Sequence, residues 1–79
     1  MERTQALDAI RELAVEMLDV QAMQVTETAS FADDLEADSL DLAELVMGLE
    51  ERFDISVPEE ALEDVSTVGQ AVDMLLARA

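Results

Sequence analysis

Ser39 is the residue whose surroundings most clearly predict chemistry. It follows Asp38, whose carboxylate can cap a helix by accepting a hydrogen bond from a free backbone N–H of the first turn. Asp41 adds a second negative charge near the positive end of the helix dipole. We expect Ser39 to occupy the first helical position with its hydroxyl pointing outward. A phosphate ester on that hydroxyl would lie beside the unpaired N–H groups of a helix N-terminus, which favour an anion.

The segment after Ser39 reads as an amphipathic helix from Ser39 to Phe53. At about 100° per residue, one set of apolar side chains falls within roughly a 100° arc and predicts the buried stripe. This set is Leu42, Leu45, Val46, Leu49 and Phe53.

The opposite face of this helix carries Leu40 and Met47, bracketed by the carboxylates of Glu44 and Glu51. Two large apolar residues within an acidic field predict a docking surface with an apolar centre and a charged rim. The alternative is an ordinary solvent-facing helix with an incidental Leu and Met.

The other elements follow from periodicity and capping signals. Thr4–Leu18 reads as an amphipathic helix, and residues 19–37 as a long packed loop without a clear period. Pro58 fits the first position of a short helix, Pro58 to about Asp64. Thr67 and Gln70 fit a capping box that opens a last helix, which runs to about Ala77. The apolar stripe of the first helix is Leu7, Ile10, Ala14, Met17 and Leu18, and that of the last is Val68, Ala71, Val72 and Leu75.

These elements predict an all-α antiparallel four-helix bundle, with three longer helices, one short third helix and a long first loop. The 79 residues suffice for one domain with one core, residues 1–79. Hydrophobic residues make up 51% of the chain, which excludes a disordered acidic tail. Aromatic residues make up only 3%, so the core must be aliphatic.

Charge and composition exclude several classes of function. The net charge of −16 argues against nucleic-acid binding and stable membrane binding, and it favours a basic partner. Of the 20 acidic residues, 13 fall between Asp33 and Asp64, opposed only by Arg52. Without Cys or His, the chain cannot build a disulfide, a usual nucleophilic triad or a usual zinc site. The acidic loop also fails the calcium-loop signature, because Ser39 and Leu45 stand where glycine and glutamate are required. We therefore expect no catalytic residues and no metal, and a cytoplasmic location, since no signal peptide or membrane span is seen.

The run Asp38-Ser39-Leu40 resembles the Asp-Ser-Leu attachment motif of acyl carrier proteins, and the resemblance extends over most of the chain. Phe31 leads the motif and Glu50-Glu51-Arg52-Phe53 closes the helix. Further matches are Val57-Pro58 and Ser66-Thr67-Val68, which opens the last helix. Glu36 departs from the family, because many members have glycine there. This departure predicts that a backbone kink suited to glycine is absent.

The resemblance implies that Ser39 carries a 4′-phosphopantetheine arm, which a phosphopantetheinyl transferase installs from coenzyme A. The chain would then hold growing acyl chains as thioesters and present them to fatty acid or type II polyketide synthase enzymes. Acyltransferases and ketosynthases with basic patches are the implied partners of a monomeric carrier. The predicted docking residues are Asp38, Leu40, Asp41, Glu44, Met47, Glu51, Glu59 and Glu60. The predicted acyl-chain pocket is lined by Leu45, Val46, Leu49 and Phe53.

Other functions remain open on the sequence alone. A stand-alone peptidyl or D-alanyl carrier shares the fold, although Asp38 and the strong acidity favour an acyl cargo. An unmodified acidic module could instead bind a basic partner helix through Leu40 and Met47. The substitution Ser39→Ala separates this unmodified module from a carrier, because only a carrier needs the hydroxyl.

Overall fold

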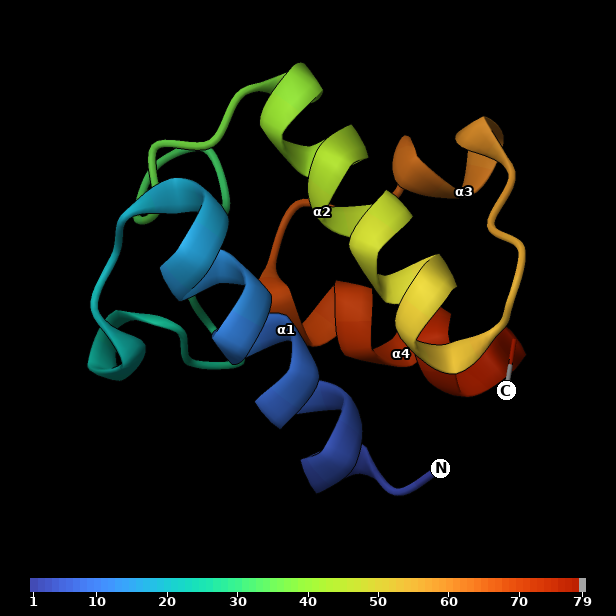
Figure 1. The fold of residues 1–79 in the computed structure, drawn as a ribbon. Coiled ribbons are helices and arrows are strands. Elements are labelled where there is room, and N and C mark those ends of the chain that lie inside the picture. The colour runs from blue at the N-terminus through green and yellow to red at the C-terminus, as the bar shows by residue number, and fades with distance from the viewer. Residues whose placement is uncertain (79) are drawn as a thin grey trace.

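Five helical segments follow one another along residues 1–78, the part of the chain that this computed structural model describes. They are α1 (Arg3–Leu18), the 3-10 helix η1 (Ala22–Gln24), α2 (Ser39–Phe53), α3 (Glu59–Leu62) and α4 (Val68–Arg78) (Figure 1). Within these residues, β-type pairing is limited to one isolated bridge between Ser30 and Thr67. The predicted all-α fold, with three longer helices, a short third helix and a long first loop, is confirmed.

Helix α1 is the centre of the bundle, because it packs against both α2 and α4. Figure 1 shows α2 running back beside α1 in the opposite sense. Small side chains on the buried face of α1, including Ala6 and Ala14, let the neighbouring helices approach closely. The core is aliphatic, as the composition predicts. Its largest fully buried side chains are Ile10, Leu35, Leu45, Leu49, Leu75, Val25, Val68 and Val72.

The last turn of α1 differs from the predicted apolar stripe. Met17 is 38% exposed, although its spacing places it with the buried Ile10 and Ala14. Its side chain borders a surface hollow whose wall includes Val20 and Leu35. Leu7 and Leu18 of the same predicted stripe are partly buried and pack against the core, so Met17 is the member of the stripe that the structure leaves at the surface.

The loop between α1 and α2 is held in place by hydrogen bonds to the start of α4. The N–H groups of Val68 and Gly69 donate to the carbonyl oxygens of Ala29 (3.0 Å) and Glu27 (2.8 Å). The Phe31 N–H donates in return to the Ser66 carbonyl oxygen, at 3.0 Å. The first N–H groups of a helix have no partners within that helix, so the loop caps α4 with its own backbone. This pairing explains how so long a connection stays ordered.

Gly69 is required by the close approach of this loop. A Cβ atom at position 69 would lie 2.9 Å from the Glu27 carbonyl oxygen, closer than real Cβ atoms come to backbone. The loop and α4 can therefore form the 2.8 Å hydrogen bond only because residue 69 has no side chain.

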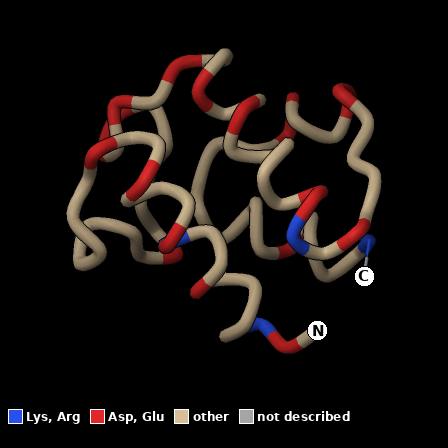
Figure 2. The backbone as a smooth tube through the Cα atoms, viewed as in Figure 1, with Lys and Arg blue, Asp and Glu red and all other residues tan. Residues whose placement is uncertain are grey.

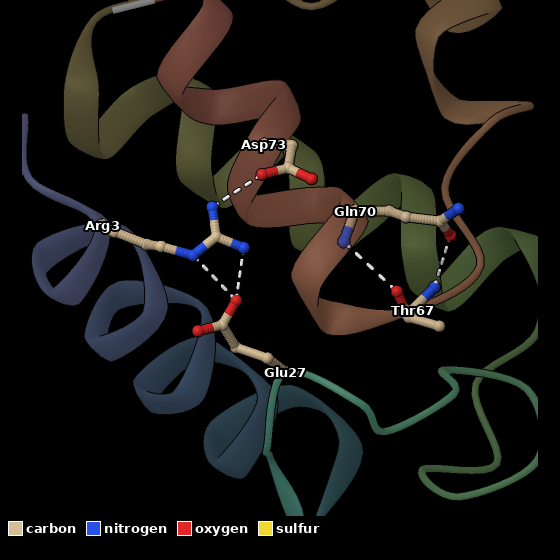
Figure 3. Close-up of polar contacts among 5 residues, drawn as sticks. All are labelled: Arg3, Glu27, Thr67, Gln70 and Asp73. Atoms are coloured by element: carbon tan, nitrogen blue, oxygen red, sulfur yellow. Dashed lines mark hydrogen bonds and ion pairs between the residues drawn. The ribbon is translucent and has the colours of Figure 1, made fainter.

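The predicted capping box of α4 is confirmed, and Figure 3 shows it. The Gln70 N–H donates to Thr67 Oγ1 at 3.2 Å, and the Thr67 N–H donates to Gln70 Oε1 at 2.9 Å. All four residues of the predicted stripe of this helix are buried: Val68, Ala71, Val72 and Leu75.

Helix α3 is shorter than the predicted span from Pro58 to Asp64. Pro58 is the N-cap, in an extended conformation, and the helix itself covers Glu59–Leu62. After Leu62 the chain continues through hydrogen bonds between residues three apart, from Glu63 to Glu60 and from Val65 to Leu62. These tighter turns end the α-helix early.

Three of the four arginines join separate elements of the fold. Arg3 of α1 donates to Glu27 of the loop and, at 2.6 Å, to Asp73 of α4 (Figure 3). The hydrogen bond to Glu27, followed by that to Asp73, raises the pKa of Arg3 above its usual value. Arg52 of α2 pairs with Glu12 of α1 at 2.7 Å, and Arg11 donates to the Val25 carbonyl oxygen at 3.0 Å.

Candidate functional site

Ser39 is the first residue of α2, where the sequence places it, and it is exposed to solvent. Asp38 precedes it as an extended N-cap, and its Oδ1 accepts the Asp41 N–H at 2.9 Å. Asp41 reciprocates, because its Oδ2 accepts the Asp38 N–H at 3.2 Å. The predicted cap at Asp38 is therefore confirmed. Asp38 and Asp41 form a reciprocal capping box, in which the two carboxylates accept backbone N–H groups on either side of Ser39.

The backbone around Ser39 suits a phosphate. Among the described residues, the N–H groups of Ser39 and Leu40 have no hydrogen-bond acceptor, whereas the next two N–H groups of α2 are paired with Asp38. Unpaired N–H groups at the positive end of a helix dipole favour an anion. A phosphodiester on the Ser39 hydroxyl therefore fits this helix start.

The loop before Ser39 contains a left-handed kink, contrary to the prediction made from Glu36. Glu36 has a φ of 54°, the backbone region that glycine adopts most readily. The residues on both sides of Glu36 impose the kink. Leu35 and Ala37 are buried, and their N–H groups donate to the carbonyl oxygens of Ser30 and Phe31, respectively. The Glu36 side chain faces solvent, so its volume meets no obstacle. Strain of this kind costs about 1 kcal/mol or more, and the surrounding packing maintains it.

The outward face of α2 has the composition that the sequence predicts. Leu40 is 66% exposed and Met47 is 59% exposed, with the exposed carboxylates of Glu44 and Glu51 beside them. Of the remaining predicted docking residues, Asp38, Glu59 and Glu60 are also exposed, and Asp41 is half-buried.

Negative charge surrounds the start of α2. Figure 2 shows acidic segments along the end of the molecule where α2 begins, with no basic segment among them. The ion pairs of Arg3, Arg11 and Arg52 lie with α1, the loop, α4 and the far end of α2. Within residues 1–78, no ion pair joins an arginine to the carboxylates of Asp38 and Asp41 beside Ser39.

A surface hollow lies directly beside Ser39, between the loop, the start of α2 and the segment before α4. Its lining comprises Ser30, Phe31, Ala32, Asp33, Ala37, Asp38, Ser39, Leu42, Val65 and Ser66. Leu42 is the one residue of the predicted buried stripe of α2 that reaches it. The predicted pocket residues Leu45, Val46 and Leu49 are almost fully buried in the core, and Phe53 is half-buried at the other end of the helix.

Sequence reasoning missed Phe31, Ala37 and Val65 as the apolar lining of this hollow. They come from two loops, so no helical period connects them with α2. The aromatic Phe31 was the one available signal, because it is one of only two aromatic residues in the chain.

Comparison with known proteins agrees with this geometry. Residues 8–75 match the family model for the phosphopantetheine attachment site, a class of domain that bears this prosthetic group. An acyl carrier protein of Phenylobacterium zucineum is 51% identical over 72 residues, 91% of each chain. One of Rubrobacter xylanophilus is 47% identical over 76 residues, 96% of this chain and 94% of its own. The solved structure of the acyl carrier protein from Enterococcus faecalis superposes with a TM-score of 0.80 at 34% identity, over all of both chains.

The chain belongs to the acyl carrier protein family. It is a carrier and not a catalyst, and 4′-phosphopantetheine is its prosthetic group. Proteins of this family interact with synthase enzymes and with a transferase that modifies them.

Two negative findings apply to residues 1–78. No three acidic side chains come close enough together to hold a metal ion. None of the helices has the length and apolar character needed to cross a membrane.

Proposed function

We propose that Ser39 carries the 4′-phosphopantetheine arm and that residues 1–79 act as a single carrier domain for growing acyl chains. One observation carries this proposal above all: the exposed Ser39 stands at a doubly capped helix start with unpaired N–H groups beside it. The arm supplies a terminal thiol, which the chain itself lacks because it has no Cys. Acyl chains are held on that thiol as thioesters.

Loading of the arm is a phosphoryl transfer from coenzyme A. The Oγ of Ser39 forms a bond to the β-phosphorus, which bears the pantetheine ester. The bond from this phosphorus to the bridging oxygen breaks, and adenosine 3′,5′-bisphosphate leaves. The serine proton passes to a base of the transferase, whose own magnesium stabilises the leaving charge. The contribution of this chain is to hold Ser39 exposed at a rigid helix start.

The hollow beside Ser39 provides a path for an apolar chain into the bundle. Phe31, Ala37, Leu42 and Val65 give it an apolar wall, and Leu45, Val46 and Leu49 lie deeper in the core. Because the core is aliphatic, its side chains can rearrange around an aliphatic guest. In this proposal Leu42 and Val65 form the entrance, and Leu45, Val46 and Leu49, with Phe53 at the far end, line the interior.

The partners are a phosphopantetheinyl transferase and synthase enzymes such as acyltransferases and ketosynthases, with basic patches that meet the acidic face. The docking face comprises Asp38, Leu40, Asp41, Glu44, Met47, Glu51, Glu59 and Glu60. The carrier acts as a monomer in the cytoplasm, where coenzyme A and these enzymes are available. Its cargo belongs to fatty acid or type II polyketide synthesis, and the acyl carrier names of its relatives support this over a peptidyl or D-alanyl cargo.

The experiment that tests this function is intact mass spectrometry after incubation with coenzyme A and a broad-specificity phosphopantetheinyl transferase. The wild-type chain should gain one phosphopantetheinyl group. Ser39→Ala should gain none, whereas Ser56→Ala, which removes another exposed serine, should gain one as the wild type does. An unmodified but folded wild-type chain would favour an acidic binding module instead.

Shielding of the cargo is tested separately by NMR on the acylated carrier. Chemical shifts of Leu45, Val46 and Leu49 should change when a saturated acyl chain replaces the free thiol. Changes confined to the neighbours of Ser39 would contradict insertion into the core.

A further inference from the structure

The sulfur atoms of this chain belong entirely to methionine, since the sequence holds five Met and no Cys. Their exposure differs widely. Met23 is 78% exposed, Met47 59%, Met1 42% and Met17 38%, whereas Met74 is buried at 9%. Thioethers oxidise according to their accessibility to the oxidant. Met23 and Met47 are therefore the most accessible sites in the molecule, and Met74 is protected by the fold.

Met47 is distinguished from Met23 by its position. It lies seven residues after Leu40 on α2, so the two apolar side chains point in nearly the same direction along the outward face of the helix. Glu44 and Glu51 lie one turn away on either side and are exposed, as Met47 is. Met23 belongs to η1, which Figure 1 shows apart from α2.

We propose that Met47 is a redox-sensitive site, at which oxidation by a peroxide to methionine sulfoxide weakens docking of the phosphopantetheinyl transferase. The inference rests on the proposed function, because it takes the outward face of α2 as the docking surface. The same modification at Met23 leaves docking unchanged.

The chemical step is a two-electron oxidation. A lone pair of the Met47 sulfur attacks one oxygen of hydrogen peroxide, an S–O bond forms and the O–O bond breaks. The released hydroxide takes up the hydroxyl proton, so the products are the sulfoxide and one water molecule. Reversal requires a methionine sulfoxide reductase, which supplies the two electrons from a dithiol.

The sulfoxide weakens docking because its polar oxygen must lose water when a partner covers Met47. The apolar centre of the face is small, consisting of Leu40 and Met47, so Met47 contributes much of the apolar area that a partner can cover. A sulfoxide oxygen buried there without a donor costs free energy on binding, and the side chain loses its apolar contact. We expect kcat/KM for transfer to fall by roughly tenfold. The fold should survive, since Met47 is 59% exposed in the folded chain and Met74 is buried.

The experiment compares wild type, Met47→Leu and Met23→Leu, each oxidised with hydrogen peroxide, freed of peroxide and assayed against its own untreated sample. Peptide mass spectrometry places the sulfoxides, and the absence of oxidation at Met74 shows that the chain stayed folded. Arm transfer from coenzyme A is then followed at varied carrier concentration. Oxidation should lower kcat/KM in wild type and in Met23→Leu, with little change in Met47→Leu. Methionine sulfoxide reductase should restore the wild-type value.

Three results would overturn the inference. They are a sulfoxide at Met47 with unchanged kcat/KM, an equal loss of kcat/KM in Met47→Leu, and oxidation of Met47 no faster than that of Met74. Failure of the proposed function is a different result, because the untreated wild-type chain would then gain no phosphopantetheinyl group at all.

Discussion

Glu36 shows how a single residue can keep a backbone shape that its type does not favour. The hydrogen bonds and burial of its neighbours fix the turn, and its side chain has open solvent on the outside. The kink delivers the chain to Asp38 and Ser39 in the extended conformation that the cap requires. Local strain at this site is therefore maintained by long-range packing around it.

The substitution Glu36→Gly should stabilise the protein by about 1 kcal/mol, because relief of a left-handed non-glycine residue outweighs the added entropy of the unfolded chain. Ala32→Gly is the matched control in the same loop, at an exposed position without a positive φ, and it should destabilise. Urea unfolding measures both changes. A loss of stability in Glu36→Gly would show that the turn carries no strain.

At the scale of elements, the fold depends on the junction between the long loop and α4. Three backbone hydrogen bonds join the loop to the start of α4 and the residues just before it, and two of them satisfy the first N–H groups of α4, those of Val68 and Gly69. Arg3 reinforces this junction from α1, because it reaches both Glu27 of the loop and Asp73 of α4. The residues that line the hollow beside Ser39 are held by the same junction, since Phe31 pairs with Ser66.

The two glycines give a sharp test of this junction. Gly69→Ala should destabilise the fold by about 2 kcal/mol, because its Cβ would press on a backbone oxygen and break a cap. Gly48→Ala should be neutral or stabilising by up to about 1 kcal/mol, since alanine favours helix and its Cβ meets only the end of the Leu13 side chain, at 3.3 Å, and no backbone atom. Thermal unfolding should place Gly69→Ala clearly below the wild type and Gly48→Ala at or above it. A similar effect of both substitutions would contradict the close approach at Gly69.

Helix α2 should act as the recognition element for the transferase. Glu44→Lys reverses a charge at the centre of the docking face, so transfer to Ser39 should slow, mainly through the association rate, and more at low salt. Glu16→Lys makes the same change at an exposed position of α1 and should slow transfer much less. Rates of arm transfer at two ionic strengths measure both variants. Equal rates for Glu44→Lys and wild type at low salt would count against α2 as the recognition surface.

For the molecule as a whole, the net charge of −16 dominates the electrostatics. Three arginines join elements of the fold through ion pairs or hydrogen bonds, and the carboxylates around α2 and α3 far outnumber the arginines near them, so they repel one another. The fold and the docking face therefore place opposite demands on charge: repulsion lowers stability, and the same field attracts basic partners.

The melting temperature should rise with added sodium chloride, from low ionic strength to about 0.15 M, because screening weakens the repulsion. Arg3→Gln should lower it in both conditions, since the bonds to Glu27 and Asp73 are lost. Calorimetry at matched pH measures both effects. A melting temperature that falls as salt is added would mean that the ion pairs of the arginines outweigh the repulsion.

The sequence was informative wherever local periodicity or capping decides the structure. The caps at Asp38 and Thr67, the exposed Leu40 and Met47, and the apolar stripe of α4 could all be predicted, because neighbours along the helix determine them. Contacts between distant segments could not be predicted. The kink at Glu36, the exposure of Met17 and the lining of the hollow by Phe31 and Val65 depend on how loops meet helices in space.

The proposed carrier function requires that Ser39 itself bear the phosphopantetheine arm. The most direct test is fragmentation mass spectrometry of the chain after arm transfer from coenzyme A, with the modified position read from the peptide ions. The arm should be found on Ser39 alone. An arm on another hydroxyl, such as that of Ser30 or Ser66 in the same hollow, would contradict the claim.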